Sequence, residues 1–113
     1  MTTANTTATV RPTTVAELDL APIDNILERS LIVETSGNKL SSTELKDFAR
    51  EIDSALATIL PTLSYERVRQ PLETSRAILQ EVIEPNRKSH SVRVLLVTIA
   101  RSELKRIVQS IKG

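Results

Sequence analysis

Apolar residues recur at helical spacing through the middle of the chain. They form one stripe at intervals of three and four residues, made of Leu45, Phe48, Ala49, Ile52, Leu56 and Ile59. This period is typical of an amphipathic helix. Ser41 can cap its start, with Glu44 at the third position of a capping box and Leu40 and Leu45 as a hydrophobic staple. Pro61 is expected to end the helix.

An earlier apolar pattern runs from Pro22 to Gly37. Its spacing is helical, Pro22 suits the first turn, and Gly37 is a natural residue to follow a helix C-terminus. A short strand at 31–33 is the alternative. Upstream, Thr14 and Glu17 have the spacing of another capping box, so a helical turn could start there.

Prolines bound the third segment. A helix here could start at Tyr65 and bend at Pro71, or start at Pro71. In either case one face would carry Val68, Leu72, Leu79, Val82 and Ile83. Pro85 and Asn86 then predict a turn.

The last segment is the most apolar. Between Val92 and Ala100 only Arg93 and Thr98 are polar. A helix that is apolar nearly all round is surrounded by protein, so this segment is expected at the centre of the fold. A buried strand would have a similar run of apolar residues. The amphipathic spacing that continues after Ala100 favours a helix, which should begin between 86 and 91.

These patterns predict an all-α fold, a compact bundle of four to five antiparallel helices forming one domain over residues 14–113. Only two glycines occur among 113 residues, too few for the turns of an all-β protein. Residues 1–13 are rich in Thr and are expected to be a disordered tail. The predicted core is Ile26, Leu27, Leu45, Phe48, Ile52, Leu56, Ile59, Leu72, Leu79, Val82, Leu95, Leu96 and Ile99.

Charge divides the chain in two. The net charge is +1, yet residues 1–86 hold 8 of the 15 basic and 13 of the 14 acidic residues, a net −5. Residues 87–113 hold the other cations and only Glu103, a net +6. On a helical wheel Arg101, Lys105 and Lys112 share a sector with three valines. This sector could be a solvated helix end, could pack beside the acidic helices, or could bind a partner.

The favoured hypothesis is a small adaptor or regulatory protein that binds another protein and forms a homodimer, because an acidic half and a basic helix are complementary across a two-fold axis. The proposed contact residues are Arg87, Lys88, Arg93, Val94, Val97, Arg101, Lys105, Val108 and Lys112. The alternative is a nucleic-acid-binding module using the same cations. Near-absence of aromatic residues and a pI near 8.1 speak against it.

Catalytic motifs are scarce. There is no Cys, His90 is the sole histidine, and no Glu-x-x-His or Gly-rich phosphate loop occurs. The pairs Glu51/Asp53 and Glu81/Glu84 are interpreted as solvated helix faces. We therefore expect no enzyme activity, no cofactor and no metal site. No apolar run suits a membrane span or a secretory signal, so a cytoplasmic protein without membrane contact is expected.

Overall fold

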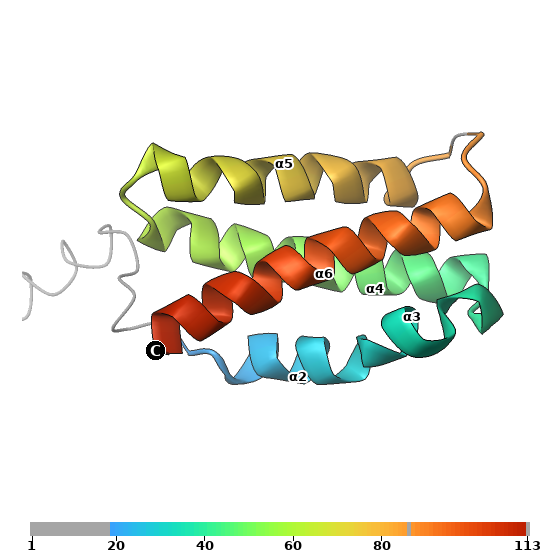
Figure 1. Cartoon of the computed structure of the whole chain (residues 1–113), viewed down its shortest axis with the longest axis horizontal. Coiled ribbons are helices and arrows are strands. Elements are labelled where there is room, and N and C mark those ends of the chain that lie inside the picture. The colour runs from blue at the N-terminus through green and yellow to red at the C-terminus, as the bar shows by residue number, and fades with distance from the viewer. Residues whose placement is uncertain (1–18, 86, 113) are drawn as a thin grey trace, which may run out of the picture.

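The computed structural model describes residues 19–85 and 87–112, and these form a helical bundle with no strand among them (Figure 1). The α-helices are α2 (Ala21–Arg29), α3 (Leu31–Ser36), α4 (Ser42–Ile59), α5 (Glu66–Ile83) and α6 (His90–Lys112). The short α2 and α3 form a single arm, so the bundle has four arms. The all-α prediction is confirmed. The Thr-rich stretch 1–13 and the capping box at Thr14 lie outside the described residues.

Helix α4 begins as predicted. The Ser41 Oγ accepts the Glu44 backbone N–H at 3.1 Å, and the Glu44 carboxylate accepts the Ser41 backbone N–H at 3.0 Å. These hydrogen bonds to Ser41, first through its backbone and then through its side chain, hold the pKa of Glu44 below its ordinary value. The helix ends at Ile59, where a 3₁₀ turn containing Pro61 follows.

The helical segment predicted from Pro22 to Gly37 is divided at Ser30 into α2 and α3, and Gly37 follows the end of α3 as predicted. Gly37 has a helical φ of −56°, so it ends α3 without the left-handed conformation that glycine commonly adopts after a helix. Its smallness is needed for another reason, since a Cβ added at Gly37 would lie 2.5 Å from Val94 Cγ1. The glycine lets this arm approach α6 closely.

Of the two predicted starts for α5, the structure has the earlier one, because the helix begins at Glu66 and passes through Pro71. The last helix begins at His90, inside the predicted window. The 31–33 segment is helical and not a strand.

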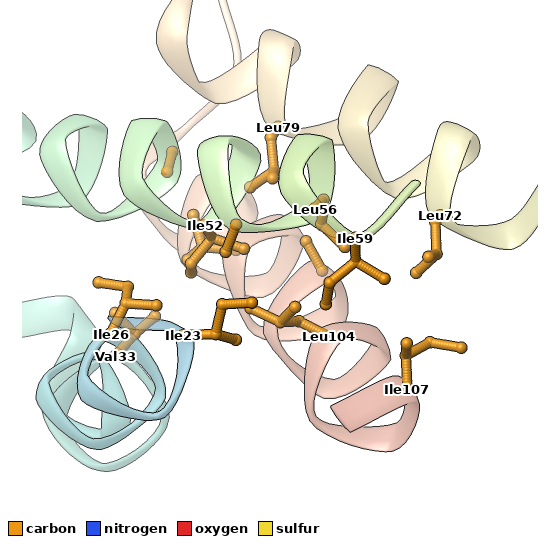
Figure 2. Packing of buried hydrophobic residues seen from close by; sticks show 14 of the residues in the cluster. Ile23, Ile26, Val33, Ile52, Leu56, Ile59, Leu72, Leu79, Leu104 and Ile107 are labelled. Atoms are coloured by element: carbon orange, nitrogen blue, oxygen red, sulfur yellow. The ribbon is translucent and has the colours of Figure 1, made fainter. Parts of the chain in front are cut away.

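The core lies where α4 faces α2, α5 and α6 (Figure 2). Most predicted core residues are buried there, while Leu27, Phe48 and Leu96 are half-buried at its edge. Two predictions are wrong, because Leu95 and Ile99 are exposed by 57% and 44%. The core also includes buried residues that were not predicted, namely Ile23, Val33, Leu40, Ala49, Ala55, Leu60, Val97, Ala100, Leu104, Ile107 and Val108.

Candidate interaction surface

Helix α6 lies between α5 and the arm of α2 and α3, and it crosses α4 (Figure 1). Three of its residues that were assigned to an outward docking sector point into the bundle: Val97, Arg101 and Val108 are exposed by 4% or less. The wheel correctly grouped these residues, but the sector faces the other helices. Within the folded chain these three side chains are covered.

Arg101 is the buried centre of that sector. Its Nε donates to the Ser30 Oγ at 2.9 Å, one Nη donates to the Glu34 carboxylate, and the other Nη donates to the Leu27 carbonyl. Burial lowers the pKa of Arg101 from its ordinary value, but an arginine remains charged at any physiological pH. The guanidinium therefore joins α6 to the break between α2 and α3.

The structure does bring Arg101, Lys105 and Lys112 together, along a groove of ≈ 260 Å³ between α2 and α6. Acidic residues of α2 line the same groove, and Lys112 Nζ lies 2.7 Å from Asp24 Oδ2. The cationic sector thus packs beside an acidic helix, which confirms one of the three interpretations of the charge pattern. Lys105 is exposed.

The remaining predicted contact residues lie near the start of α6 and do not form one surface. Lys88 Nζ is 3.6 Å from the Glu81 carboxylate, and Arg87 is exposed. Arg93 is half-buried and has an interaction partner. Val94 packs against Gly37, one turn from the contact of 3.2 Å between His90 Nε2 and the Gly37 carbonyl oxygen.

The opposite side of α6 carries a feature that the sequence did not predict. Val92, Leu95 and Ile99 are exposed by 41%, 57% and 44%, and their spacing of three and four residues puts them on one face. We call these three residues the α6 stripe. It points away from the buried sector of Val97 and Leu104, roughly half a turn round the helix.

Helix α3 adds two exposed aliphatic residues, Leu31 and Ile32. Leu31 precedes Glu34 by three residues, so it lies on the side of α3 that meets α6 through the pair of Glu34 and Arg101. Ile32 lies on another side of the same helix. Because Arg101 belongs to the buried sector of α6, this contact does not place Leu31 beside the α6 stripe.

The carboxylate pairs noted in the sequence take part in ion pairs between elements. Glu51 accepts from Arg29 at 2.6 Å, joining α4 to α2, and Asp53 accepts from Arg76 at 2.8 Å, joining α4 to α5. Among the described residues no group of three or more His, Asp or Glu side chains could hold a metal ion. Nor, within that part of the chain, is any helix long and apolar enough to cross a bilayer.

Comparison of the chain with protein-family models, with curated proteins and with solved structures found no match. The geometry of the described residues is therefore the basis for a functional proposal.

Proposed function

We propose that this chain is a non-catalytic adaptor or regulatory module that binds another protein through the outer face of α6. The observation that carries the proposal is the α6 stripe. Each of its three aliphatic side chains leaves two fifths or more of its surface exposed on a helix whose other side is fully covered. A cluster of this kind on a helix face is a typical docking surface for a second helix.

The proposal keeps the protein-binding hypothesis and changes the surface. Glu103 and Arg106 follow Ile99 by four and seven residues, so they lie on the same face and supply polar side chains beside an apolar centre, the usual anatomy of an interface. The buried Arg101 is assigned a structural role instead. Its proposed compartment is still the cytoplasm, which a chain without cysteine permits.

A nucleic-acid partner receives no support from the arrangement of the cations. Arg101 is buried, Lys112 pairs with Asp24, Lys88 with Glu81, and Arg106 with Glu103. Phosphate binding needs cations that face solvent along a shared track. Most of the basic residues of α6 are already paired within the chain.

Photo-crosslinking in cells tests the docking face. A photoreactive amino acid replaces Leu95 in one variant and Tyr65 in a control, which is 75% exposed and precedes α5 at the other end of the bundle. We expect a discrete adduct from the Leu95 position, none from the Tyr65 position, and loss of the adduct when Ile99→Glu is added. Absence of any adduct specific to the Leu95 position would refute the proposed surface.

A further inference from the structure

We infer that the occupant of the α6 stripe is a second copy of this chain, packed so that the two α6 helices run antiparallel about a two-fold axis. The inference rests on the proposed function, since it names the partner of the same surface. Two features support it, the symmetry of the stripe and the charges that flank it, and the size of the surface sets the expected strength.

The stripe is nearly symmetric about its own middle. Val92 and Ile99 are β-branched aliphatic residues at its ends, and Leu95 lies close to the midpoint. A two-fold axis perpendicular to α6 at this midpoint puts Val92 of one copy beside Ile99 of the other and brings the two Leu95 side chains together. An isologous contact requires a surface that complements itself in this way.

The flanking charges distinguish the two possible orientations. Glu103 is the only acidic residue from 87 onward, and it lies on α6 four residues after the end of the stripe. Lys88 lies four residues before the start of the stripe, in the loop two residues ahead of α6. At a shallow crossing angle of about 20° the antiparallel arrangement puts Lys88 near Glu103 of the second copy. A parallel arrangement would put like charges opposite one another along the whole helix, which is unfavourable.

The ion pairs that Lys88 and Glu103 make within the chain leave both residues able to contact a second copy as well. Lys88 reaches Glu81 at 3.6 Å, and Glu103 bonds Arg106 on the next turn. The side chains of Lys88 and Glu103 are exposed by 39% and 23%, and the Arg106 partner of Glu103 by 57%, so solvent screens these pairs and both Lys88 and Glu103 keep surface that a second copy can contact.

The size of the surface sets the expected strength. A stable dimer buries about 800 Å² on each partner, more than three aliphatic side chains provide. The second copy must therefore also cover surface around the stripe, which includes the half-buried Leu96. Such a modest, largely aliphatic contact predicts a dissociation constant on the order of 1–100 µM.

Sedimentation equilibrium of the purified full chain tests the dimer across a concentration series. We expect the wild type to pass from monomer to dimer, and Leu95→Glu to weaken association by roughly tenfold or more, equivalent to about 1.4 kcal/mol. Tyr65→Glu should leave association unchanged, and circular dichroism should show that both variants are folded. A wild-type chain that stays monomeric up to about 500 µM overturns the inference.

Engineered cysteines test the orientation, because the natural chain has none. Under mild oxidation Leu95→Cys should form a covalent dimer by itself. Val92→Cys and Ile99→Cys should each cross-link poorly alone, since equivalent positions lie about 10 Å apart along the axis, beyond disulfide reach, but should cross-link when mixed. Efficient self-cross-linking of Val92→Cys would contradict the antiparallel arrangement and indicate a parallel one.

The two proposals fail in different ways. A cellular adduct at the Leu95 position whose mass is not twice that of the chain, together with a monomeric purified protein, overturns self-association and keeps the docking face. Loss of the specific adduct altogether, with a monomeric protein, overturns both.

Discussion

At the scale of single residues, the guanidinium of Arg101 is bonded on three sides to one joint of the bundle. Its partners are a hydroxyl, a carboxylate and a backbone carbonyl at the break between α2 and α3, all 67 or more positions away along the chain. A planar group with this set of donors fits such a cluster, whereas the ammonium of a lysine offers no fixed fork. The residue therefore orients the arm of α2 and α3 on α6.

Substitution of Arg101 should destabilise the fold. Arg101→Leu leaves the Glu34 carboxylate and the buried Ser30 hydroxyl without their donor, so we expect a loss of about 2–4 kcal/mol of unfolding free energy. The unfolding free energy of Arg101→Lys should lie between those of the wild type and Arg101→Leu, because lysine keeps the charge but cannot reproduce the hydrogen-bond geometry of the guanidinium. Urea denaturation measures all three, with Lys105→Leu as the matched control.

Lys105 lies one turn after Arg101 and is exposed, so Lys105→Leu should change the unfolding free energy by less than about 0.5 kcal/mol. Equal losses in Arg101→Leu and Lys105→Leu would show that the hydrogen bonds of the guanidinium contribute nothing measurable. Sequence spacing grouped both residues as surface cations, because the partners that bury one of them are distant in the chain.

At the scale of the elements, local signals predicted boundaries well. The capping box at Ser41 and Glu44 and the proline at 61 depend on neighbouring residues alone, so the start and end of α4 could be predicted from the sequence. The orientation of α6 could not be predicted from residues 92–100, because a segment that is apolar nearly all round has no dominant face.

One sequence signal does orient α6. Residues seven positions apart lie close to the same face of a helix. The face of Val97 continues with Leu104 and Ile111, whereas the faces of Leu95 and Ile99 continue with Ser102 and Arg106. The first series stays apolar, with Val97 and Leu104 buried and Ile111 half-buried, while the others become polar and lie outside. The amphipathic second half of the helix thus indicates which face of the first half is buried.

The contact of the 3₁₀ turn with α6 gives a prediction at this scale. Gly37→Ala puts a methyl group 2.5 Å from the stiff, β-branched Val94, so we expect a loss of about 1–3 kcal/mol of unfolding free energy. The backbone of Gly37 is helical, so alanine itself fits there without strain.

A double-mutant cycle with Val94→Ala separates the steric clash with Val94 from the effect of the substitution on the backbone. Introducing Gly37→Ala into the Val94→Ala protein should cost nothing or stabilise it, because the clash is gone and the unfolded chain is less flexible. Thermal or urea denaturation of the four proteins gives the coupling energy. An unchanged cost of Gly37→Ala in both backgrounds would assign the effect to the backbone instead of to Val94.

At the scale of the whole molecule, the acidic part of the chain and the basic last helix meet inside one monomer. Lys112 pairs with Asp24, and Arg101 pairs with Glu34, so the complementarity that suggested a two-fold axis from the sequence is used largely within the chain. Besides polar residues such as Lys105 and Arg106, α6 presents the apolar stripe to solvent. The proposed self-association would therefore depend on burial of aliphatic surface, with charge setting its orientation.

A dimer that forms only from folded chains makes thermal stability depend on concentration. With free protein at about ten times the dissociation constant, mass action adds about 1.4 kcal/mol, which raises the Tm of a domain of this size by roughly 5 °C. We expect the Tm of the wild type to rise across a dilution series followed by circular dichroism. The Tm of Leu95→Glu should not change with concentration. It should equal the wild-type value at low concentration, because this exposed side chain contributes little to the stability of the monomer. A concentration-dependent Tm that persists in Leu95→Glu would mean that the chain associates through a surface other than the α6 stripe.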